Sequence, residues 1–361
     1  MSSSGAPTSD GALLRIDLAA LAANYRDMAE KSAPAACAAV VKADAYGLGL
    51  EPVVRCLLDA GCTQFCVAQL GEGVRLRAVA PEAEIYVLNG LIVGAAAHYA
   101  EHALRPCLAT PEQIADWMAT AAEHPAAVQI DTGFTRLGLT AEDLADLDLD
   151  WTPCLVMSHL ACADTPDHPM NRAQLERFHD ARARFPDVPA SLANSGGVLM
   201  GKEYLFDMTR VGIGLYGGAP TGDPDDALRP VAHLEAHIVQ IHPLGLGDSI
   251  GYGARFAASE DMRIGIVAAG YGDGLPRGMG RATPPFVHIA AAGVPVPVIG
   301  RMSMDSFAVD LTYAPETLRV GDRVELWGAH AAIDTVAQQA GTIAYELLTG
   351  LASRYKREYV S

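Results

Sequence analysis

The feature that most constrains the fold is an alternation of short apolar runs with longer amphipathic runs from about residue 37 to residue 220. A short apolar run rich in β-branched residues indicates a buried strand, and a longer amphipathic run indicates a helix that covers it. The expected strands include 38–42, 64–68, 84–88, 127–130, 155–158 and 191–193, and the expected helices include 50–60, 73–79, 111–122 and 171–185. Strands that alternate with helices over this length predict a parallel sheet closed into an eight-stranded β/α barrel.

After about residue 230 the pattern changes to closely spaced apolar runs that are separated by turn residues. The expected strands are 236–241, 264–268, 285–292, 294–298, 307–311 and 323–326, with one late helix at 335–348. This spacing is typical of a mainly antiparallel β domain. We therefore expect a flexible tail at 1–11, a barrel at 12–232 and a β domain at 233–361. An alternative is that the strand-like segment 12–17 joins the β domain.

Charge and hydropathy restrict the class of partner. The net charge of -17 argues against binding to nucleic acid or to an anionic membrane, and it favours chemistry on a small molecule. No apolar run reaches the length of a membrane span, and the first ten residues lack the features of a secretion signal. The seven cysteines have no paired spacing, so we expect free thiols, no metal site and a cytoplasmic protein.

Polar residues recur where the expected barrel strands end, which is where barrel proteins build their active sites. Lys42 ends the first strand, and apolar walls there would lower its pKa and leave a nucleophilic amine able to form a Schiff base. Arg136, His159 and Ser195 follow three other strands. Each has an ordinary alternative, as a surface arginine, a core histidine or a turn serine. Their convergence on one face favours a site.

Two segments at the ends of the last expected strands, around Ser195 and at 212–214, have the character of a phosphate site. Small residues near Ser195 and in the segment 212–214 let backbone N–H groups approach an anion. The segment is not a dinucleotide fingerprint, so the phosphate belongs to a smaller molecule. A reactive lysine and a phosphate site in one barrel suggest pyridoxal 5′-phosphate (PLP) as the cofactor.

These residues resemble the alanine racemase family. The segment VVKADAYG at 40–47 is similar to the PLP-lysine motif of that family. Further matching segments follow in order over nearly the whole chain: DTG at 131–133, RLG at 136–138, ANS at 193–195, LYG at 215–217, GYG at 251–253, GYGDG at 270–274, GRMSMD at 300–305 and GTIAYE at 341–346. Each segment is a weak signal, and together they are specific.

The resemblance implies a PLP-dependent enzyme that interconverts L-alanine and D-alanine and supplies D-alanine for cell-wall peptidoglycan. It also implies a head-to-tail homodimer with composite active sites. Lys42 would hold PLP and act as one base, and Tyr252 of the partner subunit would act as the second. The remaining roles are implied in the same way: Tyr46, Ser195, Tyr345 and the amides of Gly212 and Ile213 at the cofactor phosphate, Arg210 at the pyridine nitrogen, His159 beside the ring, Arg136 and the Met304 amide at the substrate carboxylate, and Tyr271 at the entrance.

The sequence departs from the common family pattern at three positions. Leu48 stands where a histidine is frequent and cannot donate a hydrogen bond. Gln129 stands where many members carry a carbamylated lysine, so it can hydrogen-bond Arg136 but cannot balance its charge. Ser303 replaces a frequent cysteine. The first two positions bear on substrate affinity and pH optimum and leave the reaction class unchanged.

Three other functions are compatible with parts of this pattern. A racemase of wider scope would accept serine or larger side chains, and Tyr271 and Tyr345 argue for the smaller substrate by narrowing the entrance. A PLP-dependent decarboxylase of basic amino acids would place an acidic residue at the pyridine nitrogen, where this chain has Arg210. A non-catalytic PLP carrier would lack the β domain.

Overall fold

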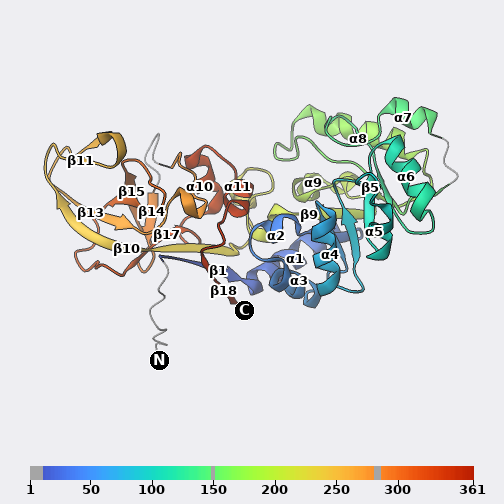
Figure 1. Ribbon diagram of the computed structural model, residues 1–361. Helices are drawn as coiled ribbons and strands as arrows, with labels where there is room; N and C mark the ends of the chain where they lie inside the picture. The colour runs from blue at the N-terminus through green and yellow to red at the C-terminus, as the bar shows by residue number, and fades with distance from the viewer. Residues whose placement is uncertain (1–10, 148–150, 280–285) are drawn as a thin grey trace. The chain divides into compact units, whose positions relative to one another are not determined.

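The computed structural model describes residues 11–147, 151–279 and 286–361. The chain divides into two compact units (Figure 1). One comprises Leu21–Arg229, and the other comprises Met1–Ala20 together with Pro230–Ser361. The residues that the sequence assigns to a flexible tail lie outside the described part, except for Gly11.

The unit Leu21–Arg229 is a nearly closed barrel of parallel strands, which confirms the predicted fold class. Eight strands pair in the order β8-β7-β6-β5-β4-β3-β2-β9. At the remaining seam, single backbone bonds join Asp207 N to Ala190 O (3.0 Å) and Arg210 N to Ala193 O (2.9 Å). The strands are β2 (Ala36–Val40), β3 (Gln64–Val67), β4 (Glu84–Val87), β5 (Arg105–Leu108), β6 (Ala127–Gln129), β7 (Leu155–Met157), β8 (Ala190–Ser191) and β9 (Met208–Val211).

Helices lie around these strands (Figure 1). They are α1 (Leu18–Ser32), α2 (Lys42–Tyr46), α3 (Leu50–Asp59), α4 (Leu70–Val79), α5 (Ala96–Glu101), α6 (Pro111–Ala121), α7 (Ala141–Asp146), α8 (Pro169–Arg182) and α9 (Ser195–Met200). Helix α6 starts as the sequence predicts. Thr110 accepts a hydrogen bond from Gln113 N at 3.2 Å, and Pro111 takes the first helical position, where no N–H is needed.

The structure corrects the expected end of the first barrel strand. Strand β2 ends at Val40, and Lys42 begins the separate turn α2 rather than ending the strand. Strand β2 buries the apolar residues of its run, and the chain then turns out of the sheet. The turn α2 therefore sets the position of Lys42, and that position depends on the contacts that stabilise the turn.

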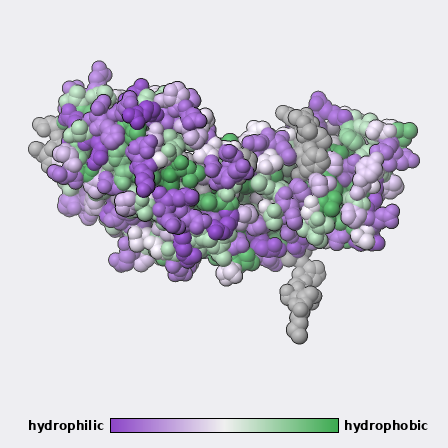
Figure 2. Space-filling model, turned by 180° about the vertical axis from the view of Figure 1, so that it is seen from behind, coloured by the Kyte–Doolittle hydropathy of each residue, from purple (hydrophilic) through white to green (hydrophobic). Residues whose placement is uncertain are grey.

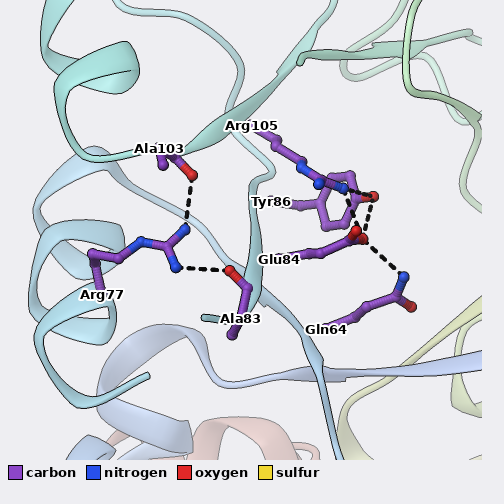
Figure 3. Close-up of polar contacts among 7 residues, drawn as sticks. All are labelled: Gln64, Arg77, Ala83, Glu84, Tyr86, Ala103 and Arg105. Carbon is purple, nitrogen blue, oxygen red and sulfur yellow. Dashed lines mark hydrogen bonds and ion pairs between the residues drawn. The ribbon is translucent and has the colours of Figure 1, made fainter. Parts of the chain in front are cut away.

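A polar network ties together the first residues of three neighbouring strands (Figure 3). Arg105 lies 2.7 Å from Glu84 Oε2 and donates a hydrogen bond to the Tyr86 hydroxyl at 3.0 Å. Gln64 donates to the same Glu84 oxygen at 2.9 Å. Burial opposes the charge of Glu84, but the hydrogen bond from Gln64 and the charge of Arg105 outweigh it, so the pKa of Glu84 lies below its usual value. In barrels this end of the strands carries stability rather than chemistry.

We expect Arg105→Met to lower the free energy of unfolding by about 1–2 kcal/mol, because it leaves Glu84 charged and only partly solvated. The loss should be largest near neutral pH. It should shrink as pH falls through the pKa of Glu84, because the carboxylate that needs the arginine is then protonated. Urea denaturation at several pH values measures both effects. Arg55→Met, which removes an exposed pair with Glu51, is the control and should change stability by less than about 0.5 kcal/mol. Equal losses in the two variants would contradict a stabilising role of the network.

The second unit is a mainly antiparallel β domain, also as predicted. Its main sheet has the order β13-β16-β15-β14-β17-β10-β1-β18, and β13 pairs with β10 as well. Only β1 and β18 are parallel neighbours in this sheet. The strands are β1 (Ala12–Asp17), β10 (Ala232–Leu244), β11 (Ser249–Ile250), β12 (Phe256–Ala257), β13 (Met262–Val267), β14 (Phe286–Ile289), β15 (Val294–Ile299), β16 (Phe307–Asp310), β17 (Arg323–Trp327) and β18 (Lys356–Val360).

The prediction of a single helix at 335–348 is wrong, because the structure has two helices in this range. Helix α10 (Ile333–Ala340) ends at Gly341, which takes the left-handed conformation with φ 73°. Helix α11 (Ala344–Thr349) then starts as a separate helix. Glycine adopts this conformation without strain, so it commonly ends helices.

Hydrophilic side chains predominate on the face shown in Figure 2, with apolar residues scattered between them. Within the described residues, no helix combines the length and the apolar character needed to cross a membrane.

Candidate active site

Lys42 is followed by a left-handed turn that is unusual for its residue types. Ala43, Asp44, Ala45 and Tyr46 have φ values of 53°, 55°, 55° and 54°. For residues other than glycine this conformation costs about 1–2 kcal/mol each. Such strain persists only where surrounding contacts impose it, and it is concentrated at functional sites.

Hydrogen bonds close the turn on its carboxyl side. Gly47 N donates to Ala43 O at 2.8 Å, and Gly49 N donates to Asp44 O at 2.9 Å. The carboxylate of Asp44 accepts from Leu50 N at 3.2 Å, which joins the turn to the start of α3. These hydrogen bonds hold the backbone after Lys42 in one conformation. In this conformation the side chain of Tyr46 is buried.

The side chains of Tyr46 and Ser195 meet the backbone at the end of β9. Ser195 Oγ accepts hydrogen bonds from Gly212 N at 2.9 Å and Gly214 N at 3.4 Å. A Cβ atom on Gly212 would lie 2.5 Å from the Tyr46 hydroxyl, so only glycine fits there. The N–H of Ile213, between the two glycines, has no acceptor among the described residues. Two hydroxyl groups and a run of small-residue amides therefore converge, and this arrangement fits a phosphate group.

Arg210 is a buried cation whose hydrogen-bond partners are all neutral. Its side chain comes from β9 and is 4 % exposed. It donates to Ser191 Oγ and to the backbone oxygens of Ser158 and Leu192. Burial lowers the pKa of this guanidinium. No carboxylate in the described part of the chain pairs with Arg210, so its charge is available to polarise a bound group.

His159 lies in the electrostatic field of Arg210 and Arg136, and Lys42 lies in that of Arg136. Burial lowers the pKa of Lys42, and the charge of Arg136 lowers it further. Burial, followed by the charges of Arg210, Arg136 and Lys42, lowers the pKa of His159 to about 3. The imidazole is therefore neutral near physiological pH. These four residues, predicted from separate strand ends, act on one another in the folded barrel.

Phe134 supports both Arg136 and His159, and the sequence analysis did not single it out. The guanidinium carbon of Arg136 lies 4.2 Å from the centroid of the Phe134 ring. The His159 ring meets the same ring edge-on, with centroids 5.4 Å apart. Within the described residues Arg136 has no ion pair with a carboxylate, so its charge is stabilised by the aromatic face instead.

Gln129 and Leu48 show what the departures from the family pattern do structurally. Gln129 donates from Nε2 to Leu137 O at 2.9 Å and makes no bond to the Arg136 guanidinium. It therefore fixes the backbone next to Arg136, which differs from the direct hydrogen bond that the sequence left open. Leu48 is fully buried and serves as an apolar core residue.

The four remaining predicted site residues lie in the β domain and are exposed. Tyr252, Tyr271, Met304 and Tyr345 are 67 %, 38 %, 54 % and 40 % exposed. Backbone bonds from Tyr271 N to Ser303 O (3.1 Å) and from Gly272 N to Met304 O (2.8 Å) join two of their loops. The domain thus exposes four large side chains, three of them tyrosines.

The loop of Tyr252 lies against Arg301. A Cβ atom on Gly253 would lie 3.5 Å from Nη1 of Arg301. Arg301 lies in the segment GRMSMD at 300–305, and no role was predicted for it from the sequence. Its position brings a positive charge next to the residue that follows Tyr252.

Two further residue types were missed in the barrel. Ser158 and Ser191 accept hydrogen bonds from Arg210, and their signal in the sequence is only that Ser158 follows β7 and Ser191 ends β8. Glu72 contacts the residue after Lys42, and its signal is the capping box it forms with Gln69 at the start of α4. A capping box predicts a helix start and gives no hint of the second contact.

A half-buried lysine after one strand and a run of small-residue amides after another, in a β/α barrel followed by a β domain, are typical of the class of barrel enzymes that use a lysine-bound phosphate cofactor. Comparison with known proteins identifies the family. Residues 16–220 match the family described as alanine racemase, N-terminal domain, and residues 231–359 match alanine racemase, C-terminal domain. The chain belongs to the alanine racemase family.

Individual relatives agree along nearly the full length. The biosynthetic alanine racemase of Agrobacterium fabrum is 46 % identical over 96 % of this chain and 93 % of its own length. The catabolic alanine racemase of the same organism is 44 % identical over 96 % of this chain and 92 % of its own. The crystal structure of alanine racemase from Bartonella henselae with covalently bound pyridoxal phosphate superimposes with a TM-score of 0.92, at 36 % identity, covering 97 % of this chain and 99 % of that one.

Proposed function

We propose that this protein is a PLP-dependent alanine racemase that interconverts L-alanine and D-alanine. The observation that carries the proposal is the grouping of Lys42, Arg210 and the Ser195–Gly212 phosphate site at one end of the barrel, in a chain of this family. When bound, PLP acidifies the Cα–H of the amino acid joined to it. The protein then has to remove a proton from one face of Cα and return one to the other.

Lys42 is the first base in this proposal. Burial and the charge of Arg136 favour its neutral form, which is the form that accepts a proton. Arg136, without a carboxylate partner among the described residues, receives the carboxylate of the substrate together with the Met304 amide of the partner subunit. His159 stays neutral beside the cofactor ring and therefore adds no further charge.

The cofactor phosphate is held by Tyr46, Ser195, Tyr345 and the amides of Gly212 and Ile213. The Oγ of Ser195 already accepts a hydrogen bond from Gly212 N, and the hydroxyl of Tyr46 lies where a side chain on residue 212 would start. Arg210 donates a hydrogen bond to the pyridine nitrogen. An arginine keeps its proton, so it orients the ring without protonating it.

Tyr252 of the partner subunit is the second base, and Tyr271 of the partner subunit lines the entrance. This part of the proposal is supported by the exposure of both side chains and by the nearby Arg301. It requires a homodimer in which each active site draws on two chains. We place the enzyme in the cytoplasm, where D-alanine for peptidoglycan is made.

A chiral assay of the purified protein with PLP tests the function. Because the two substrates are mirror images, the equilibrium constant is unity, and kcat/KM should be equal in the two directions. Testing each chiral proteinogenic L-amino acid measures scope, and serine racemisation at a comparable rate would favour the broader alternative. Release of carbon dioxide from lysine or ornithine without racemisation of alanine would contradict the proposal.

Arg210→Glu should increase the formation of pyridoxamine phosphate per turnover. A carboxylic acid at this position can share a proton with the pyridine nitrogen, which strengthens electron withdrawal and opens transamination. A lowering of that barrier by only about 1.4 kcal/mol gives a tenfold increase. Chromatography of the cofactor after turnover measures it, with Arg210→Lys as the control that keeps the positive charge. If the glutamate variant is folded and forms no more pyridoxamine phosphate than the wild type, this account of Arg210 is wrong.

A further inference from the structure

The carboxylate of Glu72 binds three backbone N–H groups, and one of them belongs to the residue that follows Lys42. Oε1 accepts from Ala43 N at 2.7 Å. Oε2 accepts from Ala68 N at 2.8 Å and from Gln69 N at 3.1 Å. Hydrogen bonds to a charged acceptor are about twice as strong as bonds between neutral groups. Glu72 therefore joins the left-handed turn to the segment between β3 and α4.

The bond to Ala43 is made at the point where the left-handed conformation begins. Inside the turn, the carbonyl oxygens of Ala43 and Asp44 accept hydrogen bonds from Gly47 N and Gly49 N. The N–H of Ala43 donates to an acceptor outside the turn. Glu72 provides that acceptor from a residue 29 positions away. A contact from another element is what a strained backbone needs in order to persist.

Helix α4 makes a second contact with the same turn through Arg75. Its Nη2 lies 2.9 Å from Asp44 Oδ1. The two side chains are 63 % and 46 % exposed, so solvent weakens this pair. The Glu72 side chain is half-buried and uses both of its carboxylate oxygens, and its bond to Ala43 N lies at the surface, as the Arg75 contact does.

We propose that Glu72 is a positioning residue for Lys42, whose carboxylate fixes the left-handed turn and thereby the direction in which the lysine side chain leaves the backbone. The inference rests on the proposed function only where it takes Lys42 as the cofactor lysine. Glu72 contacts the backbone of the turn, so it acts through Lys42 rather than on the substrate.

Two variants of Glu72 separate the effect of the position of its carboxylate from the effect of its charge. Glu72→Gln keeps the shape, but its single amide oxygen cannot serve both Ala43 and Ala68, and it removes the charge. Glu72→Asp keeps the charge and shortens the reach by one methylene. Glu51→Gln is the matched control, because Glu51 is an exposed first-turn glutamate of α3 that pairs only with Arg55 among the described residues.

Three quantities are measured on the full-length protein: hydrogen exchange of the peptide spanning 42–49 without PLP, the dissociation constant of PLP, and kcat and KM for alanine. We expect both Glu72 variants to show about tenfold faster exchange in this peptide and about tenfold weaker PLP binding, as for the loss of one hydrogen bond to a charged group. The kcat should fall more than the KM rises, and Glu51→Gln should match the wild type.

Exchange and PLP affinity within twofold of the wild type in both Glu72 variants would overturn the proposal. So would a defect in Glu72→Gln that Glu72→Asp lacks, because that result assigns Glu72 a role through charge alone. Uniformly faster exchange over the whole barrel would also overturn it, since that marks general destabilisation. The exchange result does not depend on turnover, so a wild type without racemase activity refutes the proposed function and leaves this inference to be decided by exchange.

Discussion

Lys42→Ala is expected to reduce racemisation by about 10⁴-fold or more, because it removes both the covalent attachment of the cofactor and one of the two bases. The variant should also lose PLP on dialysis, while the wild type retains it. Borohydride reduction followed by peptide mass spectrometry should attach the cofactor of the wild type to the peptide that contains Lys42. The fold should remain, because Lys42 makes no ion pair among the described residues that the substitution would break.

The control for this experiment is Lys31→Ala. Lys31 is an exposed residue in the last turn of α1. Its replacement should leave racemisation and cofactor retention unchanged. Covalent PLP on a peptide other than the one with Lys42, or substantial racemisation by Lys42→Ala, would show that the cofactor lysine has been misassigned.

Tyr252→Phe is expected to reduce racemisation in both directions by about 10²–10⁴-fold, the usual contribution of a general base. The more telling result is one-sided. In deuterated water the variant should still exchange the Cα–H of D-alanine, because Lys42 serves that face, and should lose the exchange of L-alanine. Nuclear magnetic resonance of each enantiomer, incubated separately, measures the two rates.

Tyr313→Phe is the matched control, since Tyr313 is a tyrosine of the same domain, is 84 % exposed, and donates its hydroxyl to Glu260. It should behave as the wild type. Equal loss of exchange from the two alanine enantiomers in Tyr252→Phe would refute the two-base assignment. Mixing Tyr252→Phe with Lys42→Ala adds a test of the composite site, because a mixed dimer regains one active site with both bases.

The barrel was predictable because each strand is buried on both faces and therefore reads as a short apolar run. Strands β5 and β9 were missed. Their sequences, RPCL and MTRV, include a proline, a threonine and two arginines, and these interrupt the apolar run. Arg105 and Arg210 find partners only from other strands, so no local pattern marks these segments as strands.

The left-handed turn after Lys42 could not be predicted from local sequence. Alanine favours the right-handed helix, so the residues 43–46 carry no signal for the opposite hand. The bond from Ala43 to Glu72 spans 29 positions, and the contacts of Arg210 with Ser191 and Ser158 span 19 and 52. The motif resemblance predicts which residues react, while the groups that contact Ala43 and Arg210 became visible only in the folded chain.

The parallel pairing of β1 with β18 has a consequence for biosynthesis. Leu13 lies opposite Lys356, so a strand made at the start of translation waits for a partner made more than 300 residues later. The barrel residues have all left the ribosome long before then, and domains generally fold as units during synthesis. The edge of β1 that pairs with β18 therefore stays open until the end of synthesis, although its other edge can already pair with β10.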